Sequence, residues 1–151
     1  MNPQNAVELI EAKEVLPRLT TDLEENKDVC LWCYTVEPQF FDSYFLAKRP
    51  AAKTLVLMDY RQRDRLRHFL KIHPRLELRH WQRNRTQHDK TIICVNTGVV
   101  WFTTSNLHRG SFMLANNRAL RVTAPTVVTK ILTTFLEQWQ LSQLIEEETH
   151  S

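Results

Sequence analysis

The stretch HDKTIICVNTGVVWFTTSN, residues 88–106, decides the fold. It contains two β-prone apolar runs, 90–95 and 99–103, each about as long as one strand. Asn96-Thr97-Gly98 joins the two runs, and a short link that contains Asn and Gly is typical of a β-hairpin. We therefore predict two antiparallel strands at this point in the chain.

Polar side chains stand at the open end of this predicted hairpin. His88 and Lys90 are two positions apart, so a strand places both side chains on one face. Thr104 and Asn106 follow the second run and arrive at the same end. The side chains of His88, Lys90 and Asn106 can therefore converge at this end.

Two strand–helix units precede the hairpin. Their alternation predicts a parallel sheet covered by helices, to which the hairpin adds antiparallel strands. The expected strands are 29–36, 54–58 and 76–81, and the expected helices are 40–48 and 60–72.

The remaining segments flank this core. A last strand is expected at 119–122 and a closing helix at 126–145, while residues 1–25 are expected to be a helical segment that kinks or restarts near Pro17. The sequence has no internal repeat and no long linker, which predicts one domain over residues 1–151. The predicted fold is α/β, with a mixed, mostly parallel sheet flanked by helices.

Composition excludes several classes of function. Hydrophobic residues make up 42% and charged residues 25% of the 151 positions, as in an ordinary globular protein. The two glycines, Gly98 and Gly110, cannot form a glycine-rich phosphate loop or a dinucleotide fingerprint. The sequence contains no apolar run of about 18 residues, and its acidic start is unlike a secretory signal. We therefore expect a cytoplasmic protein without a membrane span.

The three cysteines allow two interpretations. Cys30 and Cys33 have the spacing of a redox pair, but they lie in an apolar run that predicts a strand, where their side chains would point to opposite faces. Buried structural thiols, Cys94 included, are therefore favoured over redox chemistry. The sequence offers no second Cys pair and no HxxxH to complete a zinc site, so we expect no metal and no cofactor.

Positive charge is concentrated in one part of the chain. Between Arg61 and Lys90 there are ten of the 20 Lys and Arg residues and three acidic ones, although the net charge is only +3. Such a segment suits an anionic partner, DNA or RNA first, although a solvated basic surface balanced by the acidic termini is the alternative. The residues that we expect to bind nucleic acid are Arg61, Arg65, Arg83 and Arg85.

The sequence resembles the HxKxxxxD…GSxN signature of the phospholipase D superfamily. The features that carry the resemblance are the strand that begins with His-x-Lys, the hairpin, the TTSN segment and the closing helix with FLEQWQ. The match is to the nuclease-like branch, which has one motif per chain. The resemblance implies that His88 is a nucleophile that forms a phosphohistidine without metal. It implies that Lys90, Thr104 and Asn106 hold the phosphate. It also implies a homodimer, because the two-histidine mechanism needs one His88 from each subunit.

The sequence departs from that signature at its acidic positions. Val95 stands where the motif has its aspartate, and the neighbouring Asn96 is expected to take that place. Asn116 and Asn117 stand where relatives carry an acidic residue that orients the histidine. An amide accepts a hydrogen bond but does not stabilise an imidazolium, and the equivalent Asp-to-Asn change in a serine protease slows catalysis about 10⁴-fold.

Two hypotheses of function therefore follow. One is a metal-independent phosphodiesterase or nuclease that acts on DNA or RNA. The other is a catalytically silent, phospholipase D-like module that binds nucleic acid or a protein partner. A lipid hydrolase ranks lower, because the sequence has no amphipathic or lipidated anchor.

Overall fold

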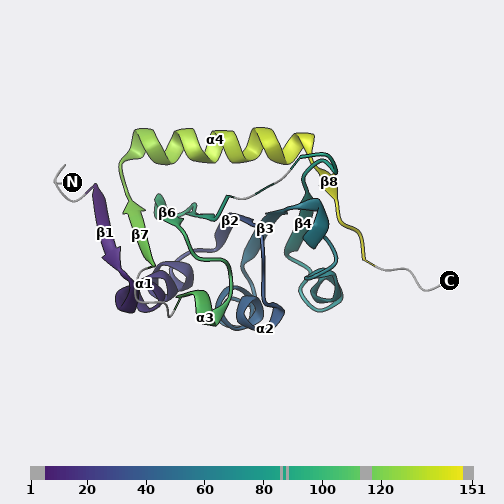
Figure 1. Ribbon diagram of the computed structural model, residues 1–151, viewed down its shortest axis with the longest axis horizontal. Coiled ribbons are helices and arrows are strands. Elements are labelled where there is room, and N and C mark those ends of the chain that lie inside the picture. The colour runs from purple at the N-terminus through teal and green to yellow at the C-terminus, as the bar shows by residue number, and fades with distance from the viewer. Residues whose placement is uncertain (1–5, 86, 88, 113–116, 148–151) are drawn as a thin grey trace.

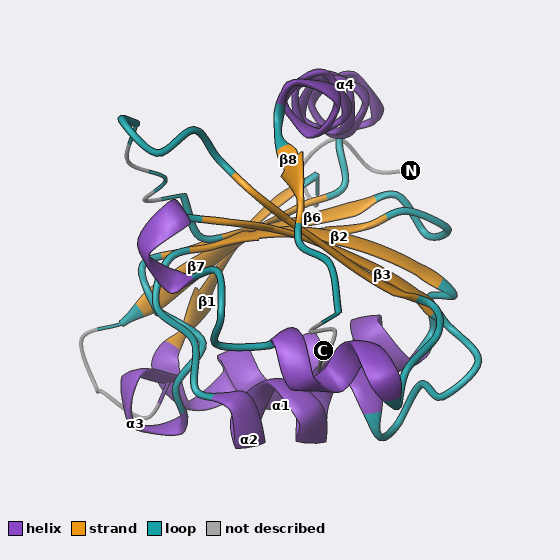
Figure 2. Ribbon diagram, turned by 90° about the vertical axis from the view of Figure 1, so that its right-hand side faces the viewer, coloured by secondary structure: helices purple, strands orange, loops and turns teal. Residues whose placement is uncertain are grey.

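The computed structural model describes residues 6–85, 87, 89–112 and 117–147. In it, a single sheet lies between two layers of helix (Figure 1). Figure 2 shows α4 on one face of the sheet and α1, α2 and α3 on the other. The strands are β1 (Val7–Glu11), β2 (Asp28–Cys33), β3 (Lys53–Met58), β4 (Leu76–His80), β5 (Thr91–Cys94), β6 (Val99–Thr103), β7 (Arg118–Val122) and β8 (Gln143–Leu144). The α-helices are α1 (Ala12–Glu24), α2 (Pro38–Phe41), α3 (Arg109–Phe112) and α4 (Pro125–Leu141).

The strand order is β1-β7-β6-β5-β2-β3-β4-β8. Five of these strands point one way (β1, β2, β3, β4 and β6) and three point the other way, so the predicted mixed α/β sheet is confirmed. Among the named strands, the neighbouring pairs β2–β3 and β3–β4 are parallel, and each is joined by a crossover that contains helical segments. The predicted hairpin is β5–β6, in which Cys94 pairs with Val99 across the turn.

The two faces of the sheet belong to two separate apolar clusters, and β2 contributes to both. Cys30 packs in the cluster beneath α4, whereas Cys33 packs in the cluster against α1 and α2. The side chains therefore point to opposite faces, as predicted. Burial raises the pKa of both thiols to about 12, so they are protonated structural groups at neutral pH.

Helix α4 closes one face through its aromatic side chains. Phe135 is fully buried, and its ring meets the ring of Trp32 edge to face with 5.0 Å between centroids. Burial of a side chain of this size stabilises the fold by about 1.5–3 kcal/mol. The helix ends at Leu141, earlier than predicted, because Ser142 is extended and the following residues pair with β4 as β8.

The described part of the N-terminal segment contains the strand β1 at Val7–Glu11, so the prediction of a helix is wrong for these five residues. β1 pairs antiparallel with β7 over its whole length, and α1 follows it directly. The apolar spacing of residues 6–19 also fits a strand followed by a helix, and pairing with β7 decides between the two. α1 continues through Pro17 without the expected restart.

The two predicted helices between the strands are shorter and less regular than expected. Residues 60–72 form two 3₁₀ segments, η3 (Tyr60–Gln62) and η4 (Arg67–Lys71), because the Asp59 side chain accepts a hydrogen bond from the Arg61 amide and starts a tight turn. After α2 the chain widens into a π-helical segment, η2 (Asp42–Leu46).

A buried arginine follows η2 and explains how this segment ends. Arg49 is only 5% exposed, and its guanidinium donates to the carbonyls of Asn26 and Phe45 and to the hydroxyl of Thr54. Burial lowers the pKa of Arg49, and carbonyl dipoles at a helix C-terminus compensate for part of that cost. The residue fastens η2 to the starts of β2 and β3.

None of the helices in the described part of the chain is both long enough and apolar enough to cross a membrane.

Candidate functional site

The C-terminal ends of β2 and β6 meet the start of β5 at one edge of the sheet. Thr103 donates its amide to the carbonyl of Lys90 over 3.2 Å, which brings the residue before β5 beside the end of β6. A narrow, shallow pocket lies at this edge. Its empty volume of about 190 Å³ includes open solvent, and it has no enclosed space large enough for a water molecule. Its lining consists of Trp32, Cys33, Tyr34, Lys90, Ile92, Thr103, Asn106 and Leu107.

Asn106 is held in the pocket by the segment that follows β2. Its Oδ1 accepts from the Thr35 amide at 3.4 Å, and Val36 pairs with Leu107 in a short parallel bridge. With Oδ1 bonded to the backbone, the group that Asn106 can offer as a donor is its Nδ2 amide. The structure thus brings together Lys90 and Asn106, two of the predicted site residues.

The threonine that lines the pocket is Thr103, whereas the predicted phosphate-binding residue is Thr104. Thr103 lines the pocket and accepts a hydrogen bond at Oγ1 from the Ser105 amide, whereas Thr104 is exposed, with its hydroxyl 3.5 Å from Asn117 Oδ1. The sequence contained a signal for this, because alternation along β6 places Thr103 on the same face as the buried Trp101. Asn117 also donates through Nδ2 to the carbonyl of Ser111.

Asn96, which is expected to take the place of the motif's aspartate, lies away from this site. It lies in the hairpin turn at the opposite end of β5, where Oδ1 accepts from the Asp28 amide at 2.8 Å and Nδ2 donates to the Asp28 carboxylate. At about 3.3 Å per residue, a strand carries Asn96 roughly 20 Å from Lys90. His88 and Asn116 lie outside the described residues, so their roles stay predictions.

The residues on either side of His88 are described, and hydrogen bonds hold both. The Gln87 amide donates to Asp59 Oδ2 at 2.7 Å, and its side chain donates to the carbonyls of Cys33 and Asp89. Asp89 in turn donates its amide to Gln87 Oε1 and accepts at Oδ1 from the Thr91 hydroxyl. Asp59 and Gln87 were not predicted from the sequence, because side-chain-to-backbone bonds leave no periodic pattern.

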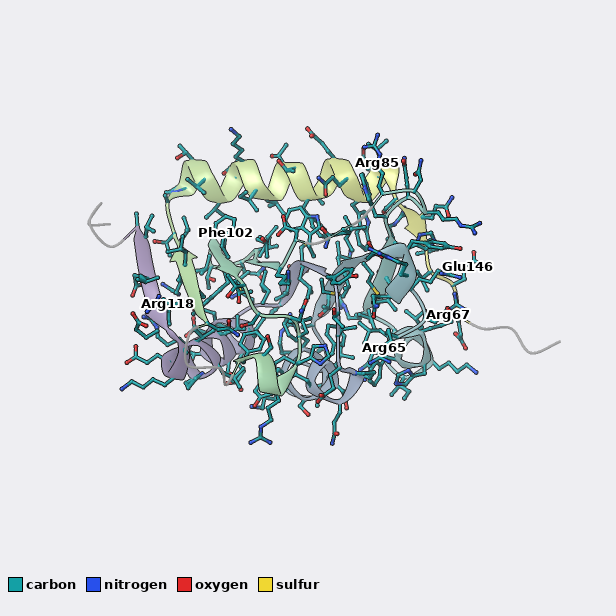
Figure 3. The ribbon with its side chains drawn as sticks, viewed as in Figure 1. Arg65, Arg67, Arg85, Phe102, Arg118 and Glu146 are labelled. Carbon is teal, nitrogen blue, oxygen red and sulfur yellow. The ribbon has the colours of Figure 1, made fainter. Side chains whose placement is uncertain are left out.

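The four predicted nucleic-acid-binding arginines divide into two pairs. Arg61 lies over the ring of Tyr34 at 5.5 Å, and Arg65 donates to the carbonyl of Val36, so both lie close to the segment after β2. Arg83 lies 5.7 Å from the ring of Tyr60, and Arg85 is exposed in the loop between β4 and β5. In Figure 3, Arg85 lies toward α4 and Arg65 on the opposite side of the sheet.

Of the described residues, no three His, Cys, Asp or Glu side chains are grouped so that they could hold a metal ion.

The similarities to known proteins rest on structure alone. No protein-family profile and no curated protein matches the sequence. NucT from Helicobacter pylori is similar with a TM-score of 0.76 and 13% identity, over 91% of this chain and 98% of that one. Nuc from Salmonella typhimurium, a phospholipase D family member, is similar with a TM-score of 0.74 and 14% identity, over 93% and 98%.

A third similar structure is that of a chromatin protein. TrmBL2, an archaeal chromatin protein with a novel mode of DNA binding, is similar with a TM-score of 0.65 and 16% identity, over 95% of this chain and 55% of that one. At these identities the likenesses show that the fold is shared.

Proposed function

We propose that this chain, which has the phospholipase D fold, is a metal-independent phosphodiesterase of nuclease type that acts on DNA or RNA as a homodimer. The observation that carries the proposal is the gathering of Lys90, Thr103 and Asn106 around one pocket at the sheet edge, with Lys90 two positions after His88 in the chain. The pocket supplies an ammonium, a hydroxyl and an amide for one phosphate.

The proposed reaction proceeds in two displacements at phosphorus. An imidazole nitrogen of His88 attacks, a P–N bond forms and a P–O ester bond breaks, while the second subunit's histidine protonates the departing oxygen. The second subunit's histidine then takes a proton from a water molecule, whose oxygen attacks phosphorus. The P–N bond breaks, the phosphate monoester is released, and both imidazoles return to their starting protonation states. Lys90 and Asn106 stabilise the charge on the nonbridging oxygens during both steps.

Nucleic acid is the favoured substrate because arginines lie against aromatic rings, one of which lines the pocket. Arg61 lies against Tyr34, which lines the pocket, while Arg63 and Arg83 lie 3.9 Å and 5.7 Å from the ring of Tyr60. Guanidinium groups bind backbone phosphates, and both guanidinium planes and rings stack on bases. The DNA binding of the similar TrmBL2 agrees with this assignment.

A catalytically silent binding module is the second candidate. It is favoured by Asn116 and Asn117, which stand where an acidic residue would orient the histidine. The Asn117 side chain donates through Nδ2 to the carbonyl of Ser111 in α3. Such a chain would keep the phosphate pocket and the arginines but would lack the carboxylate that stabilises an imidazolium.

Cleavage of labelled DNA and RNA in EDTA distinguishes the two candidates. We expect the wild type to cleave, His88→Ala to bind without cleaving, and Lys90→Ala to lose both binding and cleavage. Lys53→Ala is the matched control, because this exposed lysine begins β3 at the opposite edge of the sheet. Cleavage that persists in His88→Ala, or that EDTA abolishes, excludes the phosphohistidine mechanism.

Restoring a carboxylate tests the silent module directly. If orientation of His88 limits the rate, Asn116→Asp should cleave faster than the wild type, and Asn117→Asp provides the neighbouring control. Nucleic-acid binding without cleavage in the wild type and in both variants would support the binding module in place of the enzyme.

A further inference from the structure

We propose that Asp59 is a positioning residue for this site, and that it fixes both Arg61 and the chain that enters His88. The inference rests on the proposed function, because it assigns a role within the same site. Asp59 comes directly after β3 and is only 1% exposed. A carboxylate buried to this degree requires hydrogen-bonding partners, and their identity indicates what it organises.

Both oxygens of Asp59 accept hydrogen bonds from Arg61, and Oδ2 also accepts one from the Gln87 amide. Oδ1 accepts from the amide and from Nε of Arg61, both at 2.9 Å. Oδ2 accepts from the Gln87 amide at 2.7 Å and from Nη2 of Arg61 at 3.4 Å. One side chain thus connects the end of β3 to the loop that leads to β5, a separation of 28 residues in the chain.

The charge on Asp59 is necessary for this arrangement. Burial by itself would raise the pKa of the carboxyl, but hydrogen bonds from Arg61 and from the Gln87 amide outweigh it and hold the pKa below its ordinary value. All of the partners are donors, and a carboxylate has acceptor sites on both oxygens. An asparagine would place an NH₂ group against one set of donors.

The hydrogen bonds continue from Asp59 to both neighbours of His88. Gln87, whose amide Asp59 holds, donates through Nε2 to the carbonyls of Cys33 and Asp89 and accepts from the Asp89 amide. Cys33 belongs to the pocket lining. The backbone before and after His88 is therefore fixed relative to the pocket through two side chains, Asp59 and Gln87.

The second branch runs through Arg61. Its guanidinium is held on one side by both oxygens of Asp59 and lies over the ring of Tyr34, which lines the pocket. A bidentate interaction fixes the orientation of a guanidinium as well as its position. Asp59 thereby sets where this cation stands relative to a phosphate bound beside Lys90.

The test is the kinetics of Asp59→Asn. We expect kcat to fall about 10- to 100-fold through the Gln87 branch, since small displacements of reacting groups have costs of this size, and KM to rise through the Arg61 branch. In an Arg61→Ala background, Asp59→Asn should still lower kcat but should no longer raise KM. Changes in KM that simply add in the double variant would overturn the connection through Arg61.

Asp22→Asn is the matched control. Asp22 is also a buried carboxylate, 5% exposed, and it accepts from Trp101 and Arg121, but it lies near the hairpin turn at the opposite edge of the sheet. Its replacement should lower the melting temperature as Asp59→Asn does, while kcat and KM remain unchanged. If Asp59→Asn does not fold, Gln87→Met tests the same branch, with a fall in kcat and an unchanged KM as the expected result.

Hydrogen–deuterium exchange tests the positioning without any reaction. The Gln87 amide should exchange at least about ten-fold faster in Asp59→Asn, because its acceptor is weakened, and at the wild-type rate in Asp22→Asn. An unchanged exchange rate overturns the proposal whatever the kinetics show. If exchange accelerates but the wild type cleaves no diester, the proposed nuclease activity fails while the positioning role of Asp59 stands.

Discussion

At the scale of single residues, the hairpin turn depends on one backbone conformation. Gly98 has a φ of +69°, a region that residues with a Cβ rarely adopt, and it ends the turn that contains Asn96. The turn is also bound from outside, because Asn26 Oδ1 accepts from the amides of Asn96 and Thr97. The conformation of Gly98 therefore sets how the hairpin reaches α1.

Gly98→Ala should lower the free energy of unfolding by about 1–2 kcal/mol, the cost of a left-handed conformation for a residue with a Cβ. No heavy atom lies within 4 Å of the added Cβ, so the destabilisation would come from the backbone alone. Gly110→Ala is the control, since Gly110 lies in α3 with equal space and should not be destabilised. Urea denaturation of both variants measures the difference, and equal stabilities would contradict this account.

The site could be predicted from the sequence only where its residues follow the strand pattern. Lys90 and Asn106 could be found because they flank two recognisable strands. Asp59 and Gln87 could not, because the bonds that connect them to the site, from the Gln87 amide to Asp59 and from Gln87 to the Cys33 carbonyl, join segments far apart in the sequence. Asn96 lies in the hairpin turn, far from the site, because each residue of a strand adds about 3.3 Å of length. Counting positions along the motif does not take this distance into account. For Thr103, the alternation of side chains between the two faces of β6 indicates that the residue lines the pocket, whereas its position in the motif does not.

At the scale of elements, the strands were easier to predict than the helices around them. The apolar runs of β2, β3 and β5 are buried on both faces, and their composition alone identifies them. Residues 60–72 have a helix-like apolar spacing, but Asp59 starts a 3₁₀ turn there. In β1, pairing with a strand from the far end of the chain decides the structure. The pairing of β1 with β7 is not contained in the local sequence.

Pro17 provides a prediction at this scale. It lies inside α1, is exposed and supplies no amide to the helical hydrogen bonds, which costs a helix interior about 3 kcal/mol. Pro17→Ala should therefore raise the free energy of unfolding by about 1–3 kcal/mol, measured by urea denaturation. A destabilised Pro17→Ala would instead show that the ring contributes essential packing, since Pro17 lines a surface groove with Leu16 and Tyr44.

At the scale of the whole molecule, the proposed mechanism requires two chains. One His-x-Lys occurs per 17.9 kDa chain, so the active species should be a symmetric dimer of about 36 kDa. Light scattering at micromolar concentration should give that mass, and the His88→Ala variant should remain dimeric. A monomer that is fully active would exclude the two-histidine mechanism.

The concentration of positive charge between Arg61 and Lys90 leads to a second prediction for the whole molecule, the salt dependence of nucleic-acid binding. Binding of DNA or RNA should weaken with salt, and replacing any one of the phosphate-binding arginines should reduce the slope of log K against log salt by roughly one. The arginines to replace are Arg61, Arg65, Arg83 and Arg85. Neutralising Lys27 and Lys53, which are exposed at the opposite edge of the sheet, is the control. Arginine variants with unchanged affinity and slope would mean that the basic segment is a solvated surface.

The position of β1 has a consequence for how the chain folds during synthesis. β1 is paired only with β7 among the described strands. Two ion pairs join them, and one of these, Glu8 with Arg121, spans 113 residues. On the ribosome, β2, β3 and β4 can emerge and pair while β1 still has no neighbour to bind. Of the described strands, β1 is therefore synthesised first and is among the last to join the sheet, and until β7 has been synthesised its backbone groups have no strand to pair with.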